Sequence, residues 1–392
     1  MNCDSISATG RMPKVCFVSC SLRMRGLLHR VPDTPTGGAE FQQVIMARAL
    51  AAAGTPVEFL LLSEDGFDAE VTDDGIPVNL GIRSPVGNRF LRTAKALFSV
   101  LHSVRRVRAD VYYVRGACAE AGYTGLASRL CRKVFVFGVA HNRDLDGGHA
   151  SGMNALNRWL YNAAIRGASA VFVQTEEQMR LLHSRYGREG ILIRNMCPID
   201  RAPDDGMERD TILWVGRFRP VKRPEWVVEL ASRIPDRRFE MIGGFNEADR
   251  PLWQRVVDGA DGLGNLRLAG QVSAGETESY YRRAMMLVLT SEAEGFPNVF
   301  LEACRAGIPT VTTFDPDGLI AARGLGYHCG DIEELIARVR ELAEDEQTRR
   351  EMGRRAFEYV RDNHSTEAVA ARLIETFGRL AADRSRVSSG RK

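Results

Sequence analysis

Two glutamates with a loop and the start of a helix between them are the first candidates for chemistry. Glu294 and Glu302 lie in the stretch SEAEGFPNVFLEACRAGIPTV with seven residues between them. We expect a helix to begin at Asn298, after the Gly-Phe-Pro-Asn loop, with Glu302 about one turn inside it. Backbone N–H groups of the loop and two carboxylates could then bind different parts of one long hydroxylated ligand. Local spacing equally fits an alternative in which Glu302 pairs within its own helix and Glu294 is solvated.

Two cations form a second candidate group. Arg217 and Lys222 flank a turn in GRFRPVKRPEWVVELA, ahead of a helix expected near Pro224. Because guanidinium is a planar fork and ammonium a point charge, the two beside a helix start would suit a diphosphate. A solvated basic turn explains the same residues equally well.

Two weaker candidates lie in the first half of the chain. Gly37 and Gly38 open a helix expected near Ala39, where unpaired N–H groups could bind an anion or a hydroxyl. His141 directly follows the apolar segment VFVFGVA, and an imidazole there could bind a ligand or transfer a proton. The alternative for the two glycines is a plain turn. The alternative for His141 is a structural or merely exposed histidine.

Short apolar segments that alternate with helical ones must position these residues. Because the strand-like segments are apolar on both faces, they predict buried parallel strands in two successive α/β doubly wound sheets. Ligands bind such sheets at the carboxyl ends of the strands, so we expect a cleft there. The predicted strands begin at Lys14, Val57, Asp110, Val134 and Ala170, and then at Thr211, Phe239, Leu266, Met285 and Pro309.

The predicted domain organisation follows from this alternation and from one polar, proline-containing stretch. We expect a first domain over 1–197, a linker over 198–210 and a second domain over 211–363. A last helix over 364–384 is expected to cross back to the first domain, and a disordered tail to follow over 385–392.

Composition narrows the function class. The net charge of +3 on 392 residues does not indicate a nucleic-acid binder. No apolar run approaches the ~20 residues of a membrane span and no signal-like segment stands at the start, so a cytoplasmic location is expected. The eight cysteines form no C-x-x-C pair, and no D-x-D run is placed to hold Mg²⁺, so neither a metal nor another cofactor is expected.

One stretch is locally basic. Residues 83–108 hold seven Arg and Lys residues and no acidic residue, around the amphipathic pattern FLRTAKALFSVLHSV. A surface helix with a basic polar face is the simpler interpretation. The sharper one is a patch, Arg83 to Arg108, that contacts an anionic membrane or an anionic acceptor.

Four segments in order resemble the retaining glycosyltransferases of family 4, which have the two-domain GT-B fold. The resemblance covers about Lys14 to Arg384, and its most specific part is the E-x7-E element with its Gly-Phe-Pro-Asn loop. The other three segments are VGRFRPVKRPEWVVELA, PTGGAEFQQ and RLAGQVSAGETESYYRRA. The resemblance implies two Rossmann-like domains facing each other across a cleft, with helices at the C-terminus.

The resemblance also implies roles for the candidates. Glu294 would contact the sugar of a nucleotide-diphospho-sugar, a UDP- or GDP-sugar, and Glu302 its ribose hydroxyls. Arg217 and Lys222 would hold the diphosphate and stabilise the leaving group. His141 matches a histidine near the sugar.

Other positions would line the donor by the same resemblance. Gly37 and Gly38 would lie near the diphosphate and the sugar, and Gln271 and Val272 match the region that meets the base. Backbone groups would line the sugar–phosphate site at Phe296, Pro297, Asn298 and Val299.

The implied activity is metal-independent transfer of a sugar to a glycan, lipid-linked or small-molecule acceptor, with retention of configuration, in polysaccharide or glycolipid biosynthesis. A non-catalytic GT-B partner subunit and a sugar-nucleotide epimerase of the same fold are the alternatives. Release of nucleotide from a UDP- or GDP-sugar would separate an enzyme from a binding subunit.

Overall fold

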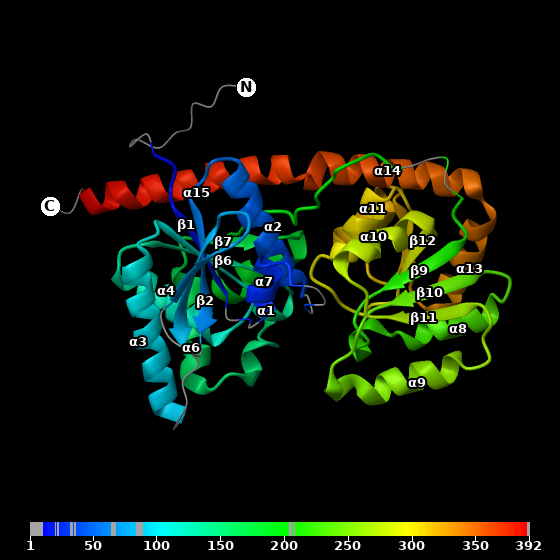
Figure 1. The fold of residues 1–392 in the computed structure, drawn as a ribbon, viewed down its shortest axis with the longest axis horizontal. Coiled ribbons are helices and arrows are strands. Elements are labelled where there is room, and N and C mark those ends of the chain that lie inside the picture. Colours follow the sequence, from blue (N-terminus) through cyan, green and yellow to red (C-terminus); the bar gives the residue numbers. More distant parts are fainter. Residues whose placement is uncertain are drawn as a thin grey trace. The chain divides into compact units, whose positions relative to one another are not determined.

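The computed structural model describes residues 11–19, 21, 23–31, 34, 37–63, 68–83, 89–203, 206 and 208–389 (Figure 1). The chain forms two compact units. The first unit comprises Met1–Met196 together with Thr366–Lys392, and the second comprises Cys197–Ser365.

A mostly parallel sheet is the centre of the first unit. Its strands lie in the order β3-β4-β2-β1-β5-β6-β7-β8, and only the β3–β4 pair is antiparallel among the described residues. The strands are β1 (Val15–Ser19), β2 (Val57–Ser63), β3 (Asp68–Val71), β4 (Pro77–Arg83), β5 (Val111–Arg115), β6 (Val134–Gly138), β7 (Ala170–Val173) and β8 (Ile191–Leu192).

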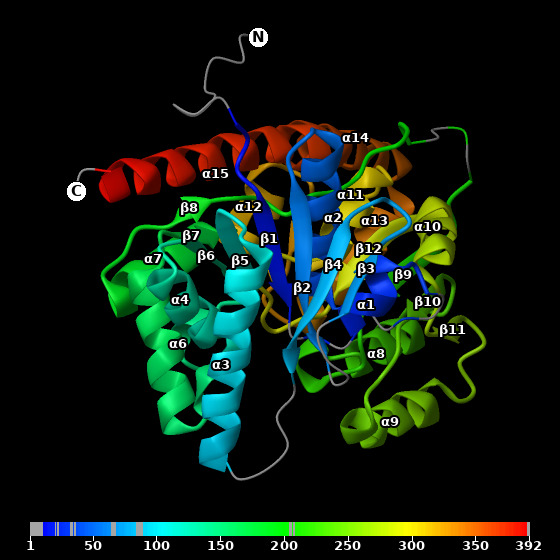
Figure 2. The same cartoon turned by 60° about the vertical axis from the view of Figure 1, so that its left-hand side comes forward.

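Helices cover both faces of this sheet because successive residues of each strand point to opposite sides. Along β1, Val15 and Phe17 pack with α1, α2 and α15, whereas Cys16 and Val18 join the core formed with α3, α4, α6 and α7. Figure 2 shows α3, α4 and α6 running side by side. The helices are α1 (Arg23–Leu28), α2 (Gly38–Ala52), α3 (Arg89–Val107), α4 (Ala119–Leu130), α5 (Arg143–Asp146), η1 (Ala150–Gly152), α6 (Ala155–Gly167), α7 (Glu176–Tyr186) and α15 (Thr366–Ser389).

The last helix belongs to the core of the first unit although it is distant in sequence. The ring of Phe377, 1% exposed, lies 5.6 Å from that of Phe172 and 6.5 Å from that of Tyr113. The helix continues to Ser389, so its described residues extend past Arg384, where we expected a disordered tail to begin.

The second unit has an all-parallel sheet in the order β11-β10-β9-β12-β13-β14 among the residues the structure describes. Its strands are β9 (Thr211–Val215), β10 (Arg238–Ile242), β11 (Leu266–Gly270), β12 (Ala284–Leu289), β13 (Thr310–Thr312) and β14 (Gly326–His328). Its helices are η2 (Pro220–Lys222), α8 (Glu225–Arg233), η3 (Glu247–Asp249), α9 (Arg250–Ala260), α10 (Ala274–Arg283), α11 (Asn298–Arg305), η4 (Pro316–Gly318), α12 (Leu319–Ala322), α13 (Ile332–Glu344) and α14 (Glu346–His364).

Again the two faces are covered separately. Core residues of α8, α9 and α13 pack on one face, and those of α10, α11 and α12 pack on the other, where α14 also contributes Ala356 and Val360. The predicted fold class, two Rossmann-like α/β domains with helices at the C-terminus, is confirmed. The strands β3, β4, β8 and β14 were not predicted, and the expected cleft between the domains stays a prediction.

The helices of the described part of the chain differ from membrane-spanning helices in length and composition. None of them is both long enough and apolar enough to cross a membrane.

Candidate active site

The carboxyl end of β9 carries Arg217 between two anchored residues. The N–H of Gly216 donates to the Ile242 carbonyl at 3.0 Å, and that of Phe218 donates to the Gly244 carbonyl at 3.0 Å. The buried Phe218 ring also packs between Trp214 and Trp253, with ring centroids 5.1 and 4.5 Å away. The backbone that presents the Arg217 guanidinium is therefore held on both sides.

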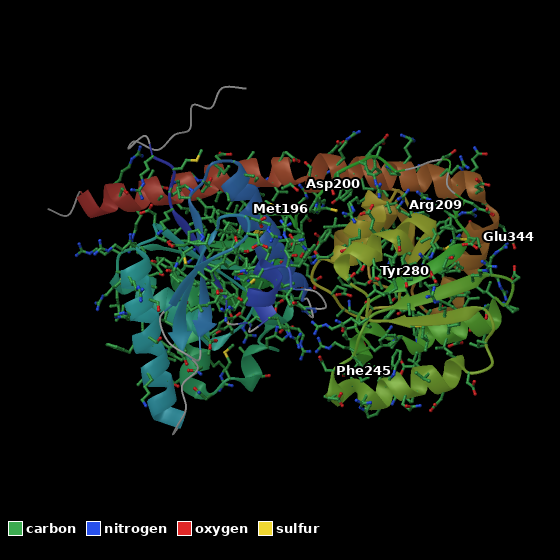
Figure 3. The ribbon with its side chains drawn as sticks, in the orientation of Figure 1. Met196, Asp200, Arg209, Phe245, Tyr280 and Glu344 are labelled. Carbon is green, nitrogen blue, oxygen red and sulfur yellow. The ribbon has the colours of Figure 1, made fainter. Side chains whose placement is uncertain are left out.

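A glycine pair that we did not single out from the sequence forms part of the same strand ends. Gly243 has φ +149°, and a Cβ at this position would overlap the Gly216 carbonyl. A Cβ at Gly244 would lie 2.6 Å from the Gln271 side-chain oxygen. Because glycine alone lets these backbones approach, the ends of β9, β10 and β11 converge here. The following loop carries Phe245, labelled in Figure 3, which stacks on Trp253 at 5.4 Å.

The turn that ends at Lys222 is tied to the end of β12, the neighbour of β9. The Thr290 hydroxyl donates to the Lys222 carbonyl at 2.5 Å and accepts from the Trp214 indole N–H at 3.1 Å. The N–H of Glu292 donates to the Val221 carbonyl at 2.8 Å. These bonds join two loops that are distant in sequence.

An ion pair forms where these loops meet. The Lys222 ammonium contacts the Glu294 carboxylate, and the two side chains are 21% and 13% exposed. The Ser291 hydroxyl donates to the same carboxylate oxygen at 2.7 Å. The structure thus brings together two predicted site residues, and their charges are poorly screened by solvent.

The loop after Glu294 leads into α11, which begins at Asn298 as expected. Pro297 is the N-cap residue, and no side chain caps the helix. The Phe296 ring packs near His364 at 5.2 Å and near Phe300 at 6.0 Å, which fixes the loop against the core. The uncapped first turn, including Val299, offers N–H groups that helix geometry leaves without an intrahelical partner.

Glu302 has different neighbours from Glu294. Its carboxylate lies near the Arg305 guanidinium and the Tyr281 hydroxyl, which donates to the Val299 carbonyl at 3.4 Å. Burial raises the pKa of the Glu302 carboxyl, and the nearby Tyr281 hydroxyl and Arg305 charge offset part of that rise. A carboxylate held in an unfavourable position in this way is a candidate for a functional role rather than a stabilising one.

This pKa shift gives a testable consequence for Glu302→Gln. A carboxyl whose pKa is raised on folding makes the folded state less stable as pH rises above the ordinary value of about 4.5. The variant should therefore unfold at a higher temperature than the wild type at pH 7, while the two midpoints converge below pH 4.5. Thermal unfolding scans across pH would measure this, and a lower midpoint for the variant at pH 7 would contradict it.

The two positions predicted to meet a base follow β11. Gln271 is exposed, and Val272 is half-buried against the core formed with α10 and α11. The structure therefore places both at the same strand ends as Gly243 and Arg217.

In the first unit, Gly37 is the N-cap of α2, and Gly38 is its first residue. A Cβ at Gly37 would overlap the Glu40 carboxylate, which folds back over the start of the helix. The sequence reasoning missed Glu40. Because a carboxylate already occupies the positive end of this helix, an anion arriving there would have to displace it.

His141 lies at the carboxyl end of β6, in a loop organised by the buried Asp144. The Asp144 carboxylate accepts hydrogen bonds from the N–H groups of Ala140 at 2.8 Å and His141 at 3.0 Å, and pairs with His149 at 2.7 Å. The His141 Nδ1 accepts from the Arg143 N–H at 3.1 Å, so a neutral His141 carries its proton on Nε2. The loop fixes both the position and the tautomer of His141.

Clusters of metal-binding side chains are missing from the described residues. No set of three or more His, Cys, Asp or Glu side chains in them has an arrangement that could hold a metal ion.

Comparison with protein families places these strand ends in context. Residues 37–194 match the Glycosyl transferase 4-like domain, and residues 199–359 match the family described as Glycosyl transferases group 1. Each half of the chain thus matches a glycosyltransferase family model. Among solved structures, the sucrose-phosphate synthase of Thermosynechococcus elongatus has a similar fold: it is 17% identical, with a TM-score of 0.78 over 95% of this chain and 100% of that one.

Two further similar proteins are informative. HepE of Anabaena, solved in complex with UDP and glucose, is 16% identical, with a TM-score of 0.73 over 93% of this chain and 99% of that one. A D-inositol 3-phosphate glycosyltransferase of Kribbella flavida is 26% identical over 50% of this chain and 53% of its own length. The chain thus spans about half the length of the curated relatives it matches.

Proposed function

We propose that the protein is a retaining glycosyltransferase of family 4 that uses a nucleotide-diphospho-sugar, a UDP- or GDP-sugar, as donor. The observation that carries the proposal is the Lys222–Glu294 ion pair at the carboxyl ends of β9 and β12. The diphosphate of a donor would compete with Glu294 for the Lys222 ammonium, and its sugar hydroxyls would donate hydrogen bonds to the Glu294 carboxylate. One donor could therefore provide partners for both charged side chains. The bound UDP and glucose in the HepE structure support this choice of donor.

The proposed chemistry depends on the leaving group. The bond between the anomeric carbon and the β-phosphate oxygen breaks, and the acceptor hydroxyl forms the new bond from the same face. The proton of the acceptor hydroxyl passes to the departing phosphate. Lys222 and Arg217 would meet the negative charge that develops on the diphosphate, and N–H groups at the start of α11 would add to this. Such charge stabilisation needs no metal ion, and we propose that none takes part.

The remaining site residues have assigned roles in the same proposal. Glu302 would accept hydrogen bonds from the ribose hydroxyls, and the cost of holding its carboxylate in a half-buried position would be recovered when a donor binds. Gln271 and Val272 would contact the base. His141, Gly37 and Gly38 would approach the sugar and diphosphate from the first unit.

The acceptor is proposed to be a glycan or a lipid-linked molecule, in polysaccharide or glycolipid synthesis. Another relative is a sulfoquinovosyl transferase of Arabidopsis thaliana, 25% identical over 38% of this chain and 30% of its own length. Its name supports the proposal that this chain transfers a sugar.

A thermal-shift screen with UDP- and GDP-sugars tests the proposed donor. A ligand that binds only the folded state stabilises it by about 2.7 kcal/mol when present at 100 times its Kd. We expect one class of nucleotide-sugar to raise the unfolding midpoint of the wild type, and to raise that of Lys222→Ala much less. If no nucleotide-sugar shifts the wild-type midpoint, the proposal fails.

We further propose that α3 contacts anionic membrane. Among the described side chains of α3, Phe98 is 70% exposed, and Lys95, Arg105 and Arg106 are exposed as well. On α6, Trp159 is 65% exposed. Exposed aromatic rings among cations are typical of helices that lie in a membrane interface. The side chains of Arg83, Arg89 and Arg92, part of the predicted patch, are outside the described ones.

Vesicle co-sedimentation measures this contact. Each cation near an anionic surface contributes about 1 kcal/mol, so Arg105→Glu/Arg106→Glu should weaken binding to phosphatidylserine vesicles at least 10-fold. Neutral phosphatidylcholine vesicles serve as the control for the charge of the membrane. The Phe98→Ser variant serves as the control for insertion of an apolar side chain into the membrane. Equal sedimentation of the wild type and the double variant would refute the contact.

A further inference from the structure

The last residue of α14, His364, is a buried polar residue that the proposed reaction does not use. It is 0% exposed, and the chain passes into the first unit two residues later, at Thr366. Burial of an imidazole costs free energy unless its nitrogen atoms form hydrogen bonds. A histidine at this place therefore requires an explanation that an apolar residue would not.

Two hydrogen bonds fix the position of His364. Its Nε2 shares a hydrogen bond with the Tyr359 hydroxyl at 3.1 Å, and Tyr359 is itself buried on the same helix. The His364 carbonyl accepts a hydrogen bond from the N–H of Cys197, the first residue of the second unit, at 2.8 Å. The ring and the backbone of His364 are thus held by groups outside the Gly-Phe-Pro-Asn loop.

The His364 ring also contacts this loop, residues 295–298. The imidazole and the Phe296 ring lie 5.2 Å apart, with an angle of 34° between their planes. Phe296 approaches Phe300 at 6.0 Å as well, but Phe300 belongs to α11, the helix that follows the loop. The contact with His364 instead joins the loop to α14.

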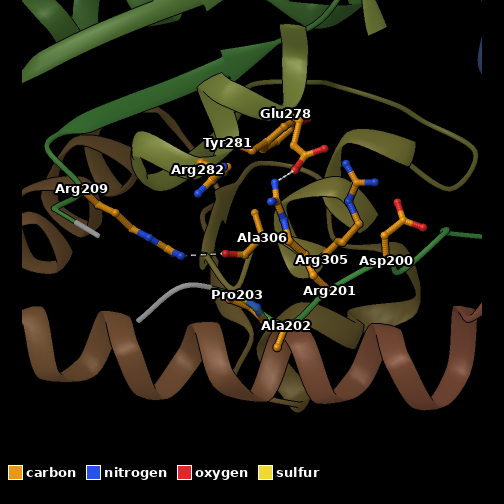
Figure 4. A pocket seen from close by; sticks show the side chains of 10 residues that line it. All are labelled: Asp200, Arg201, Ala202, Pro203, Arg209, Glu278, Tyr281, Arg282, Arg305 and Ala306. Carbon is orange, nitrogen blue, oxygen red and sulfur yellow. Dashed lines mark hydrogen bonds and ion pairs between the residues drawn. The ribbon is translucent and has the colours of Figure 1, made fainter. Parts of the chain in front are cut away.

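The helix α11 has further attachments to the same region. It lies against α14 (Figure 1). The Leu301 carbonyl accepts a hydrogen bond from the Cys197 thiol at 3.6 Å, and Arg305, whose side chain is drawn in Figure 4, donates to the Pro198 carbonyl at 3.4 Å. Both bonds lie past the first three residues of α11, so they hold the helix without fixing the loop ahead of it.

We propose that His364 is a positioning residue for the donor site. Its ring, held by Tyr359, keeps Phe296 in the orientation that presents Glu294 and the first N–H groups of α11 to one ligand. Phe296 is two residues from both Glu294 and Asn298, so a displacement of its ring changes both ends of the loop. The identity of the ligand as a nucleotide-sugar rests on the proposed function, whereas the placement of the loop does not.

Hydrogen exchange of the full chain without ligand tests the placement of the loop. His364→Ala should speed exchange of the Gly295, Phe296 and Asn298 amides about 10-fold, because it removes one ring of an aromatic pair. His364→Phe keeps a ring against Phe296 and should exchange within a few-fold of the wild type. Unfolding midpoints show whether each variant is folded.

Val339→Ala is the control for a general loss of stability. It truncates a side chain that is 0% exposed on α13, which packs on the opposite face of the sheet, and should leave loop exchange like that of the wild type. Equal loop exchange in the wild type and His364→Ala would overturn the proposal. So would an equal rise in Val339→Ala, or exchange in His364→Phe as fast as in His364→Ala.

Tyr359→Phe decides the question if His364→Ala does not fold. This change removes one hydroxyl and leaves the core filled, so only the hydrogen bond that orients the His364 ring is lost from the pair. Loop exchange a few-fold faster than in the wild type is expected, and unchanged exchange would overturn the proposal.

Titration with UDP and with GDP connects the loop to donor binding. The nucleotide that binds the wild type should bind His364→Ala about 10-fold more weakly, and His364→Phe within a few-fold of the wild type. Equal affinity of the wild type and His364→Ala would refute the role at the donor site. If neither nucleotide binds the wild type, the proposed function fails, and hydrogen exchange still decides whether His364 positions the loop.

Discussion

Replacing Lys222 by alanine should lower the rate of sugar transfer by a factor of about 10²–10³, roughly 3 kcal/mol of transition-state stabilisation. The ammonium is partly shielded from solvent in its pair with Glu294, so its charge acts strongly on a diphosphate that leaves nearby. Arg217→Ala should have an effect of the same order, because its backbone is anchored on both sides at the end of β9. Steady-state turnover with the donor identified by thermal shift would measure both.

Arg223 provides a matched control for this prediction. It directly follows Lys222 but pairs with Glu292 at 3.3 Å and lies over the Trp226 ring at 4.9 Å, so it is engaged outside the Lys222–Glu294 pair. Arg223→Ala should therefore retain turnover within a few-fold of the wild type. Lys222→Ala also leaves Glu294 without its cation, so its unfolding midpoint must be compared as well. If the Lys222→Ala variant is folded and its turnover equals that of the wild type, Lys222 does not stabilise the leaving group.

Gly243→Ala should destabilise the second unit by about 3 kcal/mol. The backbone at Gly243 has φ +149°, which is essentially accessible to glycine alone, and the added Cβ would overlap the Gly216 carbonyl. Either β9 or β10 must then shift, and Arg217 follows Gly216 directly. A loss of donor affinity should accompany the loss of stability.

The control for Gly243 is Gly262, which also has a positive φ, +80°, but where an added Cβ would meet no atom within 4 Å. Gly262→Ala should cost only about 1 kcal/mol. Differential scanning calorimetry of the two variants would separate steric overlap from backbone preference. Equal midpoints for Gly243→Ala and Gly262→Ala would show that the strands can separate without cost.

The parts of the fold that were predicted are those with strong apolar patterns. The segments TILWV and AMMLVL are apolar on both faces, and both form central strands whose ends carry Arg217 and Glu294. The strands β3 and β4 were missed because DAEV and PVNLGIR mix charged and polar residues with proline and glycine. Hydrogen bonds to β2 hold β4, and hydrogen bonds to β4 hold the edge strand β3, so both depend on neighbouring strands rather than on local preference.

The sequence offered candidate site residues but not the contacts between them. No sequence pattern indicates that Lys222 pairs with Glu294, because that contact depends on the parallel pairing of β9 with β12. Glu302 was grouped with Glu294 by spacing, yet its charged and polar neighbours are Arg305 and Tyr281.

The burial of Phe377 beside Tyr113 and Phe172 has a consequence for synthesis of the chain. Residues 197–365 form a complete folding unit as soon as they have left the ribosome. Residues 1–196 lack one helix of their unit, α15, which is translated only after residue 365. The earlier-made sheet must therefore keep an apolar face without its cover during most of translation. Nascent chains that stop near residue 365 should bind chaperones through that face, and release of the finished polypeptide should end that dependence.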